Sequence, residues 1–192
     1  MSPPLYRMNK RPFVALGLIS VILLGLMARP LSADEETTKS LGRAANYLAT
    51  QQAKDGGWHS QAYGQLKGGA AITALVLDSL SQLPDDLRKP HAAAIDRGFV
   101  FLQPGFVKKK TIAGQDGSLD FPGYGCSLWL MADKRLRRDQ DTEQAILARD
   151  YLLRAQLLEA RGFAKEHASY GGWDFLGAGD AEHFQALEHV GG

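Results

Sequence analysis

The side chains that could do chemistry in this chain are few and are spread along it. There are five histidines and one cysteine, and no Ser-His-Asp arrangement, phosphate-binding glycine loop or nucleotide fingerprint occurs in a supporting context. His59 follows a tryptophan and His167 lies in an irregular segment, so we expect both to be exposed or hydrogen-bonded loop residues. His91 follows Pro90 and fits the first turn of a helix.

Two acidic strings and one basic run are better explained by local structure than by catalysis. Asp85-Asp86 lies between Pro84 and basic residues and is typical of a solvated turn. Asp139-Gln140-Asp141-Thr142 precedes a helical pattern, where Asp and Thr side chains accept hydrogen bonds from the free N–H groups of the first turn. Lys108-Lys109-Lys110 reads as a solvated loop.

Helical periodicity dominates the elements that must position these residues, and almost no strand pattern occurs. Glycine and proline are expected to separate the helices, since glycine adopts the positive φ of a helix stop. The expected helices run from a Ser40 cap to Gly56-Gly57, from Gly69 to Leu83, from Pro90 to Gln103 before Pro104-Gly105, from near Tyr124, from Asp141-Thr142 to about Arg161, and from Ala181 to Val190. The fold class is therefore all-α.

The helices pair into three hairpins that superimpose. Tyr47, Phe101 and Tyr151 are each followed by leucine and lie 54 and 50 residues apart, which is a period typical of stacked helical hairpins. The turn Asp55-Gly56-Gly57-Trp58 also aligns with Asp116-Gly117-Ser118-Leu119. The sequence therefore predicts a repeat protein.

The repeat unit resembles the QW repeat of the squalene-hopene cyclase, oxidosqualene cyclase and prenyltransferase β-subunit superfamily. Its first copy fills every fixed position, with Arg43, Ala44, Tyr47, Leu48, Gln52, Gly56 and Trp58. The second keeps Arg97, Gly98, Phe101 and Leu102, and the third keeps Ala148, Tyr151, Leu152, Gln156, Gly171 and Trp173. The second copy lacks the Gln and Trp, and the third has an insertion after its Gln. The resemblance covers most of residues 40–190.

This resemblance implies an α/α-toroid-type array of about three helical hairpins, an incomplete toroid. The first, third and fifth helices would be outer, and the second, fourth and sixth would line the cavity. The motif residues Gln52, Trp58, Gln156 and Trp173 are expected to be structural, since an indole N–H needs an acceptor and a helix C-terminus offers free carbonyls. The open edge implies either a fragment, which we favour, or pairing with another copy or another protein.

The same resemblance suggests two kinds of chemistry, and the sequence departs from both. The cyclases use an Asp-x-Asp-Asp motif, and the nearest string here, at residues 139–142, is one acid short. Prenyltransferases hold zinc with Asp, Cys and His, for which Asp120, Cys126 and His183 are weak candidates. The family's Asp lies two residues before the Cys, where this chain has Tyr124, and a lone buried Cys is usually inert. We expect no metal and no cofactor.

Two functional hypotheses remain. The first is an exported binding or scaffold module whose concave face holds an apolar or isoprenoid-like ligand near Tyr63, Tyr124, Trp129 and Phe184. The alternative is a fragment of a squalene-hopene-cyclase-type or prenyltransferase-type enzyme whose catalytic residues lie in missing hairpins. No catalytic residue is assigned, and activity of this chain by itself is not expected.

The N-terminus is expected to be a targeting segment. Residues 1–33 combine a basic start with an apolar run, Phe13–Met27, and the small residues of Leu31-Ser32-Ala33, typical of a signal peptide or an uncleaved anchor. The remaining domain, residues 34–192, would be periplasmic or extracellular. It carries 18 basic and 21 acidic residues, a formal net charge of −3, which argues against a nucleic-acid partner. Its single Cys126 excludes an intramolecular disulfide.

Overall fold

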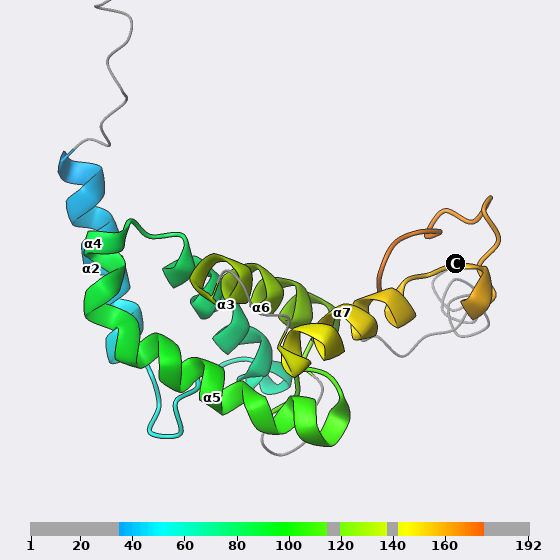
Figure 1. The fold of residues 1–192 in the computed structure, drawn as a ribbon, viewed down its shortest axis with the longest axis horizontal. Helices are drawn as coiled ribbons and strands as arrows, with labels where there is room; N and C mark the ends of the chain where they lie inside the picture. The colour runs from blue at the N-terminus through cyan, green and yellow to red at the C-terminus, as the bar shows by residue number, and fades with distance from the viewer. Residues whose placement is uncertain (1–34, 115–119, 138–141, 175–192) are drawn as a thin grey trace, which may run out of the picture. The chain divides into compact units, whose positions relative to one another are not determined.

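A computed structural model describes residues 35–114, 120–137 and 142–174 of the chain. Contacts divide the chain into two compact units, Met1–Lys39 and Ser40–Gly192. The elements are α2 (Glu35–Thr50), η1 (Gly64–Leu66), α3 (Ala70–Ser81), α4 (Asp85–Arg88), η2 (Lys89–His91), α5 (Ala92–Lys109), α6 (Pro122–Arg137), α7 (Glu143–Ala155) and η3 (Glu159–Arg161) (Figure 1).

The all-α fold is confirmed. Within the described ranges the extended pairing is limited to one isolated antiparallel bridge, between Gln156 and Trp173. None of the helices described here combines the length and the apolar character that crossing a membrane requires. The expected signal segment, the turn at 116–119 and the last predicted helix, Ala181–Val190, lie outside the described residues.

Two helix starts follow the sequence rules closely. Gly69 precedes α3 with a φ of 80°, a left-handed conformation that glycine adopts without strain. Thr142 precedes α7, and its side-chain oxygen accepts a hydrogen bond from the backbone N–H of Ala145 at 3.1 Å. The expected Gly69 and Thr142 boundaries are therefore correct.

Ser40 is not a helix cap, because α2 already begins at Glu35. Its hydroxyl instead accepts a hydrogen bond from the Arg43 guanidinium at 2.9 Å. The same helix ends at Thr50 rather than at Gly56. Its last turn tightens, since the Gln51 N–H contacts the Leu48 carbonyl at 3.1 Å. Gly56, with a φ of 92°, lies in the turn that follows the helix.

Pro104 does not stop α5, which continues through it to Lys109. Proline lacks the N–H that would bond the Val100 carbonyl, and its ring crowds that same carbonyl, but Val100 lies on the exposed face of the helix. The predicted lysine loop is therefore wrong, because Lys108 and Lys109 form the last helical turn. Lys110 follows as the cap, with a φ of 57°.

The fifth helix was predicted to reach about Arg161, but α7 ends at Ala155. Gln156 adopts an extended conformation and joins the bridge with Trp173. A separate short 3-10 helix, η3, contains Arg161. The chain leaves the helix early because Gln156 and Trp173 pair at that point.

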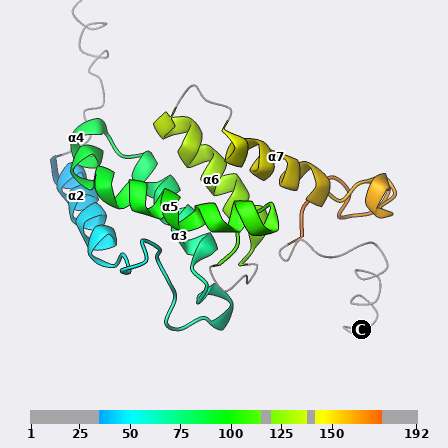
Figure 2. The same cartoon turned by 60° about the horizontal axis from the view of Figure 1, so that its bottom comes forward.

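Helices α3 and α6 lie side by side in both views (Figures 1 and 2) and run parallel to each other. At their starts, Asp120 just before α6 accepts a hydrogen bond from the Ala70 N–H of α3 at 3.2 Å. At their ends, Asp78 of α3 pairs with Arg135 of α6. Helices α3 and α6 therefore share one direction, as the predicted stacking of equivalent hairpins would require.

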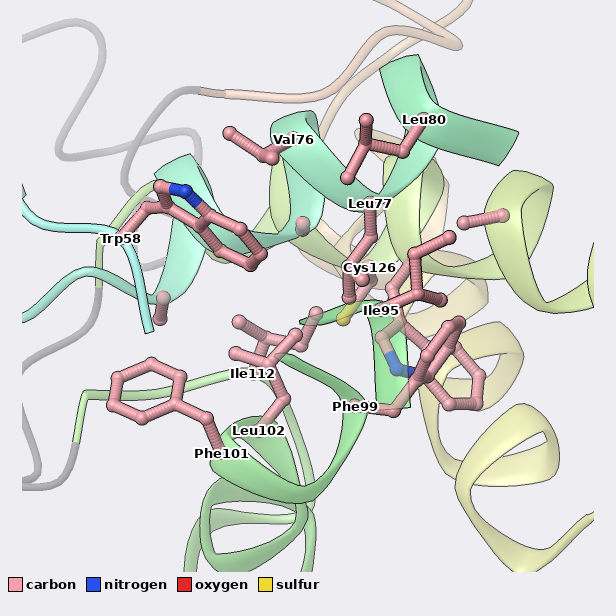
Figure 3. Close-up of a cluster of buried hydrophobic side chains, with 14 of the residues drawn as sticks. Trp58, Val76, Leu77, Leu80, Ile95, Phe99, Phe101, Leu102, Ile112 and Cys126 are labelled. Atoms are coloured by element: carbon pink, nitrogen blue, oxygen red, sulfur yellow. The ribbon is translucent and has the colours of Figure 1, made fainter. Parts of the chain in front are cut away.

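The core lies where α3, α5 and α6 meet (Figure 3). Trp58 enters it from the first hairpin turn, and its backbone N–H donates to the hydroxyl of Thr73 in α3 at 2.9 Å. Gly98 allows the close approach of α5, because a Cβ there would lie 3.0 Å from the Trp58 ring and 3.0 Å from the Leu77 side chain. Gly98 is thus a packing position.

Candidate functional site

The segments that carry Trp58 and Trp173 form the same joint. The indole N–H of Trp58 donates to the Leu48 carbonyl at 2.7 Å, and that of Trp173 donates to the Leu152 carbonyl at 2.7 Å. Each tryptophan thus donates to a carbonyl near the C-terminus of the helix that precedes it, which is the bond expected from the sequence.

The glutamines of the two joints also match. The Nε2 atom of Gln52 donates to the Gly56 carbonyl at 2.8 Å, and that of Gln156 donates to the Gly171 carbonyl at 2.8 Å. Each acceptor glycine lies two residues before its tryptophan, so the amide closes the turn that presents the indole. The insertion after Gln156 leaves this bond intact.

The two joints differ in burial. Trp58 is 3% exposed and belongs to the core, whereas Trp173 is 50% exposed. A buried indole excludes more apolar surface from water, so Trp58 contributes more to stability than Trp173.

A groove follows the open face of the parallel pair α3 and α6. It has a volume of about 310 Å³, and its lining surface is entirely apolar. The lining residues are Leu66, Ala71, Ile72, Leu75, Phe121, Tyr124 and Leu128. Leu75 and Tyr124 are 51% and 54% exposed, so apolar side chains here face water from both helices.

A second hollow of about 220 Å³ lies beside the groove and is partly polar. It is lined by Gly123, Tyr124, Ser127, Trp173 and Asp174. The hydroxyl of Ser127 donates to the Gly123 carbonyl at 2.8 Å, and Asp174 lies 3.6 Å from the Arg161 guanidinium. Tyr124 forms part of both hollows and therefore marks the boundary between them.

Of the four residues expected to line a cavity, Tyr124 lines one. Tyr63 is 70% exposed at the start of η1 and is not part of either hollow. Trp129 was expected on an open face, which is wrong: it is buried, with its ring 5.8 Å from Phe99 and 5.0 Å from Phe106 between centroids. Phe184 lies outside the described residues.

The placement of Trp129 follows from helix geometry. Tyr124 and Leu128 are four residues apart and share the groove face of α6. Trp129 is one residue further on, a rotation of about 100° around the helix, which turns it toward α5. Its indole N–H has no hydrogen-bond partner among the residues that the structure describes.

Several groove residues have the sequence pattern of core residues. Ile72 and Leu75 in α3, and Leu128 in α6, have the helical spacing that is typical of a buried face, yet all three line the groove. A usable sign was the composition of α3, whose apolar residues cover more than one face of the helix. A helix that is apolar nearly all round is usually covered on every side. In α3 one apolar side packs in the core and another lines the groove.

Two of the three zinc candidates, Asp120 and Cys126, lie in the described residues, and each is buried beside a hydrogen-bond partner. Asp120 is buried and accepts the Ala70 N–H, which places it at the start of α3. Cys126 is buried with its Sγ 3.3 Å from the Thr111 hydroxyl, and burial raises the pKa of its thiol. Across the described ranges no group of three or more His, Cys, Asp or Glu residues could hold a metal ion. His183 lies outside these ranges.

The remaining candidates have structural contacts. His91 is buried at the end of η2, one residue before α5. His167 Nδ1 accepts the Ser169 N–H at 3.1 Å, and its ring packs against Phe163. Asp85 and Asp86 begin the short helix α4 and are exposed.

His59 connects the first hairpin turn to the loop that leads into the groove. Its Nδ1 lies 2.8 Å from the Lys67 carbonyl, and its Nε2 lies 3.1 Å from the Asp55 carboxylate. Both neighbours are acceptors, so the doubly protonated imidazolium satisfies both bonds. Burial lowers the pKa of His59, but the hydrogen bonds to Lys67 and Asp55, and the charges of Asp55 and Asp120, outweigh it and raise the pKa.

This arrangement predicts a pH-dependent stability. Because the folded-state pKa of His59 is raised, its contribution is fully present below the unfolded value of about 6.5 and is lost as pH rises through the folded value. Urea unfolding at about pH 6 and about pH 8.5 should therefore show a larger loss of stability for the wild type than for His59→Gln. Equal losses in both proteins would contradict the assignment.

The chain was compared with known proteins by sequence and by structure. No protein-family model, no curated protein and no solved structure matches it.

Proposed function

We propose that this chain is a helical-hairpin repeat module that binds a neutral apolar ligand, of isoprenoid or alkyl type, in the groove between α3 and α6. The observation that carries the proposal is the groove itself: about 310 Å³, lined only by apolar surface. A volume of this size is at the lower end of the range typical of small-molecule sites. Filling it would remove the exposed parts of Leu75 and Tyr124 from water.

The repeat architecture supports this reading. In an α/α-toroid-type array, α2, α5 and α7 would be outer helices and α3 and α6 inner ones. The parallel course of α3 and α6 agrees with that assignment, and the groove lies between the two helices assigned to the inside. The predicted signal segment would deliver such a module outside the cytoplasm.

The chemistry of the lining also indicates which ligands are favoured. Among the residues that the structure describes, no lysine, arginine or histidine lines the groove, so a diphosphate would lose its hydration there without gaining a charged partner. An alcohol or hydrocarbon of the same chain length would pay no such cost. The ligand is therefore expected to be uncharged along the part that enters the groove.

Isothermal titration calorimetry with farnesol and farnesyl diphosphate tests the proposal. Farnesol should bind with a negative heat-capacity change, because apolar surface is buried, and farnesyl diphosphate should bind more weakly. Absence of farnesol binding, or stronger binding of the diphosphate, would refute the proposed groove chemistry. Analysis of the recovered ligand separates the alternatives, since a converted product would favour the enzyme hypothesis.

A further inference from the structure

The amide of Gln52 joins two repeat units. Besides the Gly56 carbonyl of its own turn, its Nε2 donates to the Ala94 carbonyl of α5 at 2.8 Å. Its Oε1 accepts hydrogen bonds from the Arg97 guanidinium, with Nε at 3.1 Å. Gln52 therefore bonds to Gly56 within the first unit and to Ala94 and Arg97 of α5, the helix that begins the second unit.

At the joint between the second and third units both members of this pair are missing. Phe106 occupies the position of the glutamine, four residues after Leu102, and Leu147 occupies that of the arginine. Phe106 is fully buried, and Leu147 is packed against the core. Within the chain, the glutamine and the arginine thus occur together or are replaced together by apolar residues.

The first and the third of the described units each carry one half of this pair, and the Arg43 side and the Gln156 side are called the two ends below. Gln156 keeps the bond to Gly171, but within the described ranges its Oε1 has no counterpart of Arg97. Arg43, the basic residue of the first unit, is exposed and donates to Ser40 of its own helix. Both ends expose large apolar side chains: Leu153 and Trp173 at one, Leu41 and Tyr47 at the other.

We propose that two copies of this chain associate head to tail, with the Gln156 end of one copy docked on α2 of the second. The Gln156 amide would donate to the Ser40 carbonyl of the second copy, since Ser40 precedes Arg43 by the same three residues as Ala94 precedes Arg97. Its Oε1 would accept from the Arg43 guanidinium, a hydrogen bond strengthened by the charge.

A second copy of the chain carries the groups that would complete the Gln156 end. It supplies the arginine at the required spacing, and the apolar side chains on the two ends provide surface to bury around the bond. The contact is heterologous, because each copy uses a different end in each contact. Repetition of the contact produces either a closed ring or an open series.

Sedimentation of the purified full-length chain over a range of concentrations tests the proposal. The wild type should form oligomers, and Arg43→Ala should weaken association by about tenfold or more, because it removes a charge-assisted hydrogen bond. Lys109→Ala is the matched control, because it removes an exposed cation of α5 that the proposed contact does not use, and it should associate like the wild type. Circular dichroism of each variant verifies that the fold is retained.

Mixing two variants tests the head-to-tail geometry directly. Arg43→Ala keeps its Gln156 end, and Gln156→Ala keeps its Arg43 end, so an equimolar mixture can form one intact contact. The mixture should associate more tightly than either variant alone. A wild type that stays monomeric at hundreds of micromolar, association unaffected by Arg43→Ala, or no gain on mixing would each overturn the proposal.

Discussion

Replacing Trp58 with alanine is expected to lower the free energy of unfolding by about 3–5 kcal/mol. The indole is 3% exposed and lies beside the Gly98 and Leu77 surfaces of two helices. Its removal would leave a cavity between the first hairpin turn and the core. It would also leave the Leu48 carbonyl without its indole donor.

Trp173→Ala is the matched control, because Trp173 makes the same indole bond at the same distance of 2.7 Å but is half exposed. Its loss should cost about 1–2 kcal/mol. Urea denaturation of both variants measures the difference. If the two substitutions cost the same, burial would not be what distinguishes the two joints.

Leu75→Glu is expected to weaken farnesol binding by about a hundredfold, because it brings an unpaired carboxylate into an apolar groove. Leu75 lines the groove and is 51% exposed. Its replacement should therefore change the free energy of unfolding by less than about 1 kcal/mol. Calorimetric titration and urea denaturation of the same preparation separate the effect on binding from any effect on folding.

Val100→Glu provides the control for this substitution. Val100 is 59% exposed on the outer face of α5 and does not line the groove. The same charge introduced there should leave farnesol binding unchanged. Equal weakening by both substitutions would show that the added charge acts at a distance and that the ligand does not occupy the groove.

The predictions that succeeded rest on local chemistry. A glycine before α3 and a threonine before α7 act through bonds or backbone angles within a few residues. The indole N–H of Trp58 donates to the carbonyl of Leu48, ten residues earlier, and both residues are fixed positions of the motif. Such features can be read from a short stretch of sequence, since all the atoms involved belong to that stretch.

Helix ends were predicted less well where a distant segment takes part. Pro104-Gly105 resembles a helix stop, yet α5 continues through it. Gly105 lies against the backbone that follows the helix, where a Cβ would be 2.7 Å from the Ala113 nitrogen. Pro104 is tolerated because the carbonyl that loses its donor belongs to the exposed Val100, and Gly105 allows the close approach of the backbone at Ala113. The local sequence does not distinguish either role from a helix stop.

The sequence by itself determined that this protein is all-α, and it predicted that the indole N–H of each motif tryptophan donates to a carbonyl near a helix C-terminus. Only the tertiary structure decided which surfaces are covered. It buries Trp129 and Trp58, leaves Trp173 half exposed, and turns Leu75 toward an open groove. The physical reason is that burial depends on the packing of helices such as α3 and α6, which are about fifty residues apart in the chain, whereas helical spacing orders side chains around one axis at a time.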